Sequence, residues 1–115
     1  LKVLRSIQIP LGSRNEFVKG GFIYIITNQH HTVLYAGVTS NLAARIKEHK
    51  EKKHPKSFSA RYNADKLVYY FFFPTIMEAI EEEKRIKGGS RENKIKIIES
   101  MNPGWKDLWE DIKEW

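Results

Sequence analysis

Residues 22–38 read FIYIITNQHHTVLYAGV, two runs of β-branched and aromatic residues on either side of the polar segment NQHH. Runs of this composition favour β-strands, and a short polar connection between them is typical of a hairpin. We therefore expect the folded part of the chain to begin with two antiparallel strands. A third strand is indicated at residues 66–73, where KLVYYFFF is followed by Pro74, a residue that ends strand pairing.

The length of the hairpin loop determines which side chains face one another. With residues 28–31 as the loop, Thr27 faces Thr32, and stepping back along both strands pairs Tyr24 with Tyr35. Directly opposed side chains have Cβ atoms about 5 Å apart. The sequence therefore predicts two phenols standing together on one face of the sheet.

A short helix is predicted directly after the hairpin, at residues 41–50 with the sequence NLAARIKEHK. Its apolar stripe consists of Leu42 and Ile46. Arg45 and His49 are four residues apart and border that stripe, so both side chains are expected to emerge near the sheet. The two phenols and this Arg/His pair should then share a surface.

The segment TIMEAIEEEKRIKGG at residues 75–89 has the period of an amphipathic helix. Its apolar stripe consists of Ile76, Ala79, Ile80 and Ile86. The same stepping places Glu83 on the buried face. An inward carboxylate is unfavourable unless a cation meets it, and that cation can be Arg, Lys or a metal ion. Glu83 is therefore a candidate site residue.

A last long helix is predicted at residues 90–102, SRENKIKIIESMN, where Ile95 and Ile98 face the core and Asn102 follows one turn later. The remaining residues, PGWKDLWEDIKEW, are interpreted as a short amphipathic tail whose tryptophans pack on the domain. The expected fold is an α/β (α+β) domain with a three-stranded antiparallel sheet flanked by helices.

Positive charge is concentrated in the first half of the chain. Residues 1–60 contain 10 Lys and Arg against 3 Asp and Glu, whereas residues 61–115 contain 10 against 11, which together give the net charge of +6. One-sided basicity is typical of proteins that bind polyanions such as nucleic acid. The candidate phosphate-binding residues lie in the loop EKKHPKSFSARYNAD and are Lys52, Lys53, Lys56 and Arg61.

Length and composition limit the protein classes. A chain of 115 residues is the usual size of one domain, and the absence of cysteine excludes disulfides, thiolate zinc sites and thiol catalysis. No apolar run reaches the roughly 20 residues of a membrane span, so we expect a cytoplasmic protein. Residues 1–20 are expected to be a tail or linker, derived in part from cloning sites, and residues 21–113 the domain.

Two tyrosines, an arginine, a histidine and an inward glutamate form an inventory that suits phosphodiester hydrolysis. A hard cation held by a carboxylate polarises phosphate oxygens. A guanidinium stabilises the charge that develops on the phosphoryl group. A phenol or an imidazole moves a proton for the attacking water or the leaving oxygen.

In these residues the sequence resembles the GIY-YIG endonuclease superfamily, and within it the small stand-alone bacterial members. Residues 22–24, Phe-Ile-Tyr, correspond to the G-I-Y motif, and residues 35–37, Tyr-Ala-Gly, correspond to Y-I-G. Arg45 and His49 match the family's next helix, and Glu83 matches its metal-binding glutamate. Phe22 and Ala36 depart from the motifs at packing positions, and Gly88-Gly89 stand where small relatives have a basic-aromatic pair.

The resemblance implies a metal-dependent endonuclease acting on nucleic acid, with DNA as the expected substrate. It implies that Glu83 holds one Mg²⁺ or Mn²⁺, that Arg45 stabilises the transition state, and that Tyr24 acts as general base or positions water. Tyr35 and His49 would support proton transfer or orient the phosphate. For the family's further asparagine, Asn102 is preferred over Asn93.

Each assignment has a structural alternative. The two tyrosines can be a cross-strand pair without chemistry, and Arg45 can form an ion pair with Glu48 or with Glu83. His30, His31 and His54 are assigned to solvated loops. For the whole protein, the alternatives are a catalytically inactive nucleic-acid-binding module of the same fold and an interaction domain using the tryptophan-rich tail.

Overall fold

The structure is a computed structural model that describes residues 20–115. The predicted tail at residues 1–20 therefore lies outside the described residues, except for Gly20. Within the described range the strands and helices are β1 (Gly21–Thr27), β2 (Leu34–Thr39), α2 (Leu42–Lys50), α3 (Phe58–Arg61), β3 (Lys66–Phe73), α4 (Ile76–Lys87), α5 (Arg91–Met101) and α6 (Trp109–Ile112).

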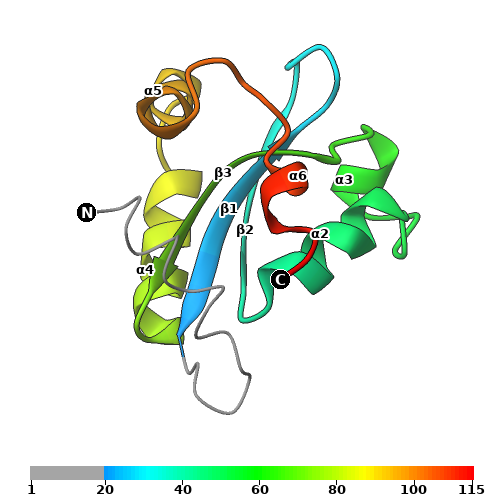
Figure 1. Cartoon of the computed structure of the whole chain (residues 1–115). Helices are drawn as coiled ribbons and strands as arrows, with labels where there is room; N and C mark the ends of the chain where they lie inside the picture. The colour runs from blue at the N-terminus through cyan, green and yellow to red at the C-terminus, as the bar shows by residue number, and fades with distance from the viewer. Residues whose placement is uncertain (1–19) are drawn as a thin grey trace.

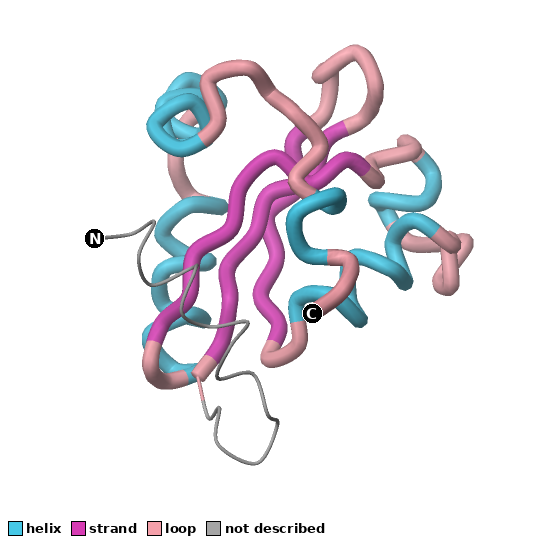
Figure 2. Tube along the Cα trace, viewed as in Figure 1, coloured by secondary structure: helices cyan, strands magenta, loops and turns pink. Residues whose placement is uncertain are grey.

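The predicted three-stranded antiparallel sheet is confirmed, with the strand order β2-β1-β3. Helices α4 and α5 lie on one side of the sheet, and α2, α3 and α6 lie on the other (Figure 1). The strands twist between these two layers of helices (Figure 2). β1 is central and buried along its whole length, because its alternate side chains enter two separate cores.

The two cores follow the alternation of β1. Phe22, Tyr24 and Ile26 pack with residues of α2 and α6. Ile23 and Ile25 face the opposite way and pack with residues of α4 and α5. Tyr24 therefore stands in an apolar core on the α2 side, with 1% of its surface exposed.

The predicted pairing of Tyr24 with Tyr35 is wrong by two residues. Tyr24 lies opposite Gly37, and Tyr35 lies opposite Ile26. The two phenols remain on the same face because a shift of two residues preserves the alternation of the strand. They are diagonal neighbours, and the ring of Tyr24 lies over the bare backbone of Gly37.

Asn28 accounts for the longer loop. Its Oδ1 accepts hydrogen bonds from the backbone N–H groups of Thr32 (2.8 Å) and Val33 (3.1 Å). The Thr27 hydroxyl also donates to the carbonyl of Val33. These contacts keep residues 28–33 out of the ladder, so the first pair below the loop is Thr27 with Leu34.

Helix α2 begins as the sequence predicts, and Asn41 is its cap, because the Asn41 side chain accepts the N–H of Ala44 at 3.1 Å. A cap of this kind contributes about 1 kcal/mol. Leu42 and Ile46 are buried in the core. Arg45 is consequently held at the edge of the core, beside the sheet.

Helix α4 also matches its predicted pattern. Thr75 and Glu78 form a capping box at its start, and the helix ends at Lys87, before Gly88. Ala79 and Ile86 are fully buried against the sheet. The side chain of Glu83, on the same face, is only 12% exposed, as expected.

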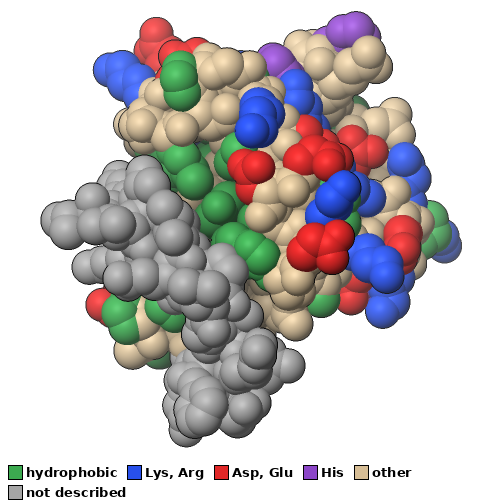
Figure 3. Space-filling view, in the orientation of Figure 1, with side chains coloured by type: hydrophobic (Ala, Val, Ile, Leu, Met, Phe, Trp, Pro, Cys, Tyr) green, Lys and Arg blue, Asp and Glu red, His purple; other side chains and the backbone are tan. Residues whose placement is uncertain are grey.

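The C-terminal segment closes the α2 side of the domain. Asp107 accepts the backbone N–H of Leu67 in β3 and the ammonium of Lys50 in α2. Trp115 packs on Phe22 and Tyr70, as expected for a tail whose tryptophans pack. On this face, charged side chains gather over the α2, α3 and α6 side, whereas hydrophobic side chains lie nearer to α5 (Figure 3). Among residues 20–115, no helix has the length and apolarity that crossing a membrane requires.

Gly37 provides a test of the observed register. A Cβ at this position would lie 2.4 Å from the Tyr24 hydroxyl oxygen, so Gly37→Ala should displace the phenol and lower the free energy of unfolding by about 1–3 kcal/mol. Gly104→Ala is the matched control, because a Cβ there meets nothing within 4 Å. Urea denaturation measures both variants. Equal stabilities would contradict the close approach of Tyr24 to Gly37.

Candidate active site

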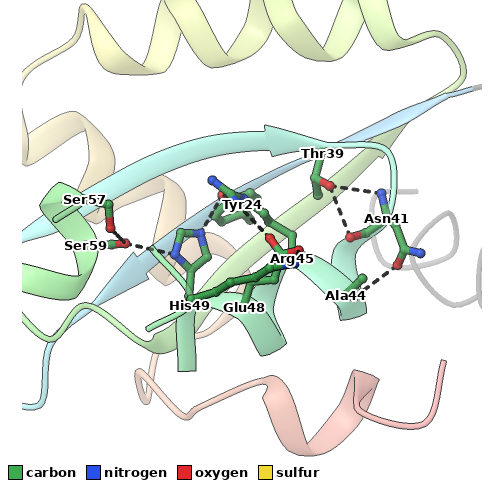
Figure 4. Close-up of polar contacts among 10 residues, drawn as sticks. Tyr24, Thr39, Asn41, Ala44, Arg45, Glu48, His49, Ser57 and Ser59 are labelled. Atoms are coloured by element: carbon green, nitrogen blue, oxygen red, sulfur yellow. Dashed lines mark hydrogen bonds and ion pairs between the residues drawn. The ribbon is translucent and has the colours of Figure 1, made fainter. Parts of the chain in front are cut away.

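The hydroxyl of Tyr24 is the centre of a polar network between β1 and α2 (Figure 4). Its oxygen lies 2.9 Å from Nε2 of His49 and 3.4 Å from Nε of Arg45. The other ring nitrogen of His49, Nδ1, lies 3.0 Å from Oγ of Ser59 at α3. A phenol, a guanidinium, an imidazole and a hydroxyl are therefore in contact, and the phenol and the imidazole are both buried.

Because Arg45 can only donate hydrogen bonds, it determines which atom of each pair in this network carries the proton. A guanidinium only donates, so the Tyr24 oxygen accepts from Arg45 and directs its own proton to His49 Nε2. The proton of the neutral imidazole then resides on Nδ1, which donates to Ser59. The network thus orders Tyr24, His49 and Ser59 into a chain of proton donors.

Burial shifts two of these groups toward their neutral forms. It raises the pKa of Tyr24 to about 12, a shift that Arg45 opposes and the charge of Glu83 reinforces. Burial also lowers the pKa of His49 to about 4, and the positive charge of Arg45 acts in the same direction. Near neutral pH the site therefore contains a neutral phenol, a neutral imidazole and one guanidinium.

A pocket of about 110 Å³ opens beside this network. Its lining residues are Tyr35, Arg45, Glu48, His49, Lys52, His54, Ser57, Ser59 and Ala60. The ring of Tyr35 meets that of His49 edge-on, with the centroids 5.9 Å apart. His54, which the sequence places in a solvated loop, therefore contributes to the pocket.

The alternatives for Arg45 are resolved in favour of Glu48, whose carboxylate lies 2.9 Å from the guanidinium. No ion pair joins Arg45 and Glu83 within the described residues. Glu83 instead pairs with Lys87, one turn along the same helix, at 2.8 Å. The Lys87 ammonium also lies 5.8 Å from the ring centroid of Tyr35, which connects α4 to the Tyr35 side of the site.

Glu83 fits a magnesium site better than a zinc site. Within residues 20–115 there is no group of three His, Cys, Asp or Glu that could hold a metal ion together. Mg²⁺ does not require such a group, because it is usually bound by one or two carboxylates, waters and substrate phosphates. A mostly buried carboxylate whose ion-pair partner is the flexible, half-exposed Lys87 suits that mode of binding.

The candidate phosphate-binding residues differ in their surroundings. Lys52 lines the pocket, and Lys53 lies 3.4 Å from the carboxylate of Glu48. Arg61 lies over the ring of Tyr62, 6.0 Å from its centroid. Lys56 is exposed. The structure therefore brings Lys52 to the site and leaves the other three cations along the loop beyond it.

Asn102 has a structural task. It is buried at the end of α5, where its amide donates to the carbonyls of Val68 and Lys106 at 3.1 and 2.8 Å. Its oxygen accepts the N–H of Lys106 at 3.0 Å. Because both amide hydrogens are used, this arrangement gives no support to the prediction that Asn102 binds nucleic acid.

Ser59 and Lys87 were not identified from the sequence. Ser59 lies in the four-residue helix α3, which is too short to show a period that would place one hydroxyl against His49. Lys87 had a usable signal, since it lies four residues after Glu83 and ion pairs at that spacing are common in helices.

Residues 20–96 match the sequence model of the GIY-YIG catalytic domain. The chain belongs to the GIY-YIG family. This confirms the resemblance seen in the motifs around Tyr24 and Tyr35, and it places the protein among nuclease domains. The matched range includes both motif strands, Arg45, His49 and Glu83.

The chain is also similar to small bacterial UPF0213 proteins. A UPF0213 protein of Staphylococcus haemolyticus is 37% identical over 78 residues, which are 68% of this chain and 93% of that protein. A UPF0213 protein of Bacillus licheniformis is 42% identical over 66 residues, 57% of this chain and 67% of that protein. The names of these GIY-YIG relatives state no activity.

A solved structure shows the same fold. The solution NMR structure of the UPF0213 protein BH0048 from Bacillus halodurans has a TM-score of 0.50 to this chain at 24% identity. The similarity covers 77% of this chain and 93% of that one. This similarity shows the fold alone and carries no information on substrate.

The depressed pKa of His49 predicts a pH dependence of stability. The unfolded imidazole takes up its proton near pH 6.5, whereas the folded one does so only near pH 4, so unfolding should become easier as the pH falls between these values. After a discount for solvent screening, the loss is about 2 kcal/mol. Urea denaturation from pH 7 to 4 measures it, and His49→Gln should flatten the profile.

His30→Gln, which removes an exposed histidine outside the site, is the matched control. If both variants alter the pH profile equally, the buried imidazole is not its source.

Proposed function

We propose that the protein is a metal-dependent endonuclease that hydrolyses phosphodiester bonds of DNA. The observation that carries the proposal is the buried Tyr24 hydroxyl held between Arg45 and His49, beside an open pocket. Membership in the GIY-YIG family supports the reaction class. The proposed metal rests on the inward carboxylate of Glu83, and a nucleic-acid substrate rests on the basic loop.

Arg45 is the group that would receive the scissile phosphate. It lines the pocket, and its Nε and one terminal nitrogen are used by Tyr24 and Glu48. The other terminal nitrogen retains donors for a phosphate oxygen. A guanidinium fixed in this way stabilises the charge that develops on the phosphoryl group without having to reorganise.

Tyr24 and His49 would handle the proton of the attacking water. As the water oxygen bonds to phosphorus and the bond to the leaving oxygen breaks, the water proton passes to the Tyr24 oxygen while the phenolic proton passes to His49 Nε2. The leaving oxygen departs with the electron pair of the broken bond and takes a proton from solvent water. An imidazole with a pKa near 4 is a weak base. The phosphodiester monoanion bound to Arg45 offsets the guanidinium charge and so raises that pKa during the reaction.

Tyr35 and Glu83 complete the site. Tyr35 lines the pocket and would orient the phosphate through its hydroxyl. Glu83 would hold the divalent cation, which, when bound, polarises the phosphate oxygen and lowers the pKa of a bound water. Release of Lys87 from its ion pair with Glu83 makes the carboxylate available to that cation.

Glu83→Gln tests the metal assignment. The substitution keeps the side-chain volume and removes the charge, so Mg²⁺-dependent nicking of plasmid DNA should fall at least about 100-fold. Without metal the melting temperature should change little, because Glu83 loses only an ion pair to the half-exposed Lys87. Added Mg²⁺ should stabilise the wild type and leave the variant unchanged.

Glu81→Gln, an exposed carboxylate on the same helix, is the control and should cleave like the wild type. A Glu83→Gln variant that cleaves at the wild-type rate would overturn the metal-site assignment. Wild-type protein that binds plasmid in Mg²⁺ or Mn²⁺ without nicking it would instead identify an inactive nucleic-acid-binding module.

The basic loop makes a second prediction, on affinity. Each lysine that contacts a phosphate contributes about 0.9 to the slope of log affinity against log salt. Replacing Lys52, Lys53 and Lys56 by Gln should therefore flatten the slope by about two to three units, with the lower figure applying if Lys53 keeps its pairing with Glu48. Fluorescence anisotropy of labelled DNA in EDTA at several salt concentrations measures it.

The matched control replaces three exposed lysines elsewhere in the domain, Lys84, Lys96 and Lys106. An unchanged slope in the loop variant, or an equal change in both, would mean that the loop lysines are solvated charge without a specific contact to phosphate.

A further inference from the structure

Two large rings, one at the start of α3 and one on the residue that directly follows it, remain on the surface beside the active site. Phe58 is 44% exposed and Tyr62 is 46% exposed. They are four residues apart, so they share one side of this helical turn, and their centroids are 4.7 Å apart. Burying both rings would stabilise the fold, so their exposure is an unfavourable feature that a binding role explains.

The exposed rings continue a line of rings that starts in the active-site pocket. Tyr35, which lines that pocket, stacks on Phe58 with the centroids 5.9 Å apart and the planes at 23°. Phe58 then contacts Tyr62, and the guanidinium of Arg61 lies at the Tyr62 ring. Aromatic surface therefore runs without interruption from the active site to the far side of α3.

Positive charge accompanies this line of rings. Residues 52–64 contain three lysines and one arginine and no Asp or Glu. Alternation of exposed aromatic rings with cations is how proteins bind single strands, since the bases stack on the rings while the cations meet the phosphates. A protein partner of matching shape would need acidic groups at every such cation.

A second pocket, of about 310 Å³, lies beyond Tyr62, between α3 and the β1–β2 loop. Its lining residues are Asn28, Gln29, His30, Tyr62, Asn63 and Asp65. In the described part of the chain, the side chains of Gln29, Asn63 and Asp65 have no hydrogen-bond or ion-pair partner. The volume is at the lower end of the roughly 300–1,000 Å³ of small-molecule sites.

We propose that Phe58, Tyr62 and this second pocket form a nucleobase-binding site for an unpaired strand of nucleic acid. The proposal deepens the proposed function, because it names the substrate of the same site as a strand whose bases are unstacked. One base stacks on the exposed face of Phe58 or Tyr62. A neighbouring base enters the pocket, and the strand then passes Tyr35 to reach Arg45.

The pocket favours bases that carry an amino group. A carboxylate such as Asp65 accepts from the exocyclic amine of cytosine, and Gln or Asn side chains pair with the donor and acceptor of adenine. Thymine and uracil have no exocyclic amine. A paired base cannot enter the pocket, because it remains stacked between its neighbours within the duplex.

Anisotropy with short labelled single strands in EDTA tests the proposal, since no cleavage interferes without metal. Tyr62→Ala should weaken binding of single strands by about 10-fold, the loss expected for one stacked base, and should leave binding of a blunt duplex of the same sequence unchanged. Tyr62→Trp keeps a stacking ring and should retain the affinity of the wild type.

Met77→Ala is the matched control, because Met77 is another exposed large apolar residue, 61% exposed, and lies on α4. A strand containing 2-aminopurine adds a stacking signal, since its fluorescence should be quenched by the wild type and by Tyr62→Trp and not by Tyr62→Ala. Poly-dC and poly-dA strands should bind more tightly than poly-dT, and Asp65→Asn should reduce the preference for cytosine.

Unchanged single-strand affinity in Tyr62→Ala, or an equal loss for single strands and duplex, would overturn the proposal. An RNA strand of the same sequence shows whether the site prefers ribose or deoxyribose. Binding of either strand that depends on the Tyr62 ring supports the proposed nucleobase site. Plasmid nicking is scored separately. Nicking with ring-independent binding refutes the nucleobase site alone, whereas ring-dependent binding without nicking refutes only the proposed nuclease activity.

Discussion

Packing of the Tyr24 phenol over Gly37 is the contact on which the site depends. A phenol placed at the centre of a sheet has to find hydrogen-bond partners, because a buried hydroxyl without a partner is costly. Gly37 has no Cβ, and this absence leaves room for the ring of Tyr24 to cross the neighbouring strand and extend to α2. The hydrogen bonds of this one buried oxygen therefore hold α2 against the sheet.

The same burial determines the charge state of the network. Burial favours the neutral forms of Tyr24 and His49, and the charge next to them belongs to Arg45, which forms an ion pair with Glu48. Glu83, on the opposite helical layer, adds a negative charge that acts on the phenol. In this arrangement the guanidinium of Arg45 can still bind an anion, and the carboxylate of Glu83 can still bind a cation in place of Lys87.

Periodic signals predicted much of this arrangement. The strands, the start of α2, the extent of α4 and the inward Glu83 all follow from repeats of two or of three to four residues, which burial enforces along the whole element. The face shared by Tyr24 and Tyr35 was also predictable, because alternation survives a shift by two residues.

Contacts without a period could not be predicted in the same way. The register of the hairpin depends on a single Asn28 side chain that holds two backbone groups of the loop. Ser59 reaches His49 from the four-residue helix α3, which is too short to show a repeating pattern. The side-chain amide of Asn102 forms hydrogen bonds with backbone groups of β3 and of the following turn. This role depends on tertiary structure alone.

The hydrogen bond between Ser59 and His49 would couple the proton affinity of His49 to the binding of the proposed strand. Ser59 directly follows Phe58 in the chain, and it contacts the imidazole that takes part in the proton chain. If a strand draws α3 toward itself and shifts that hydroxyl, the affinity of His49 for a proton changes. Thermodynamic reciprocity then requires a proton on His49 to change the affinity of α3 for the strand by the same factor. Within the described residues, the pH of the solution and the binding of the proposed strand would then act on the same hydrogen bond.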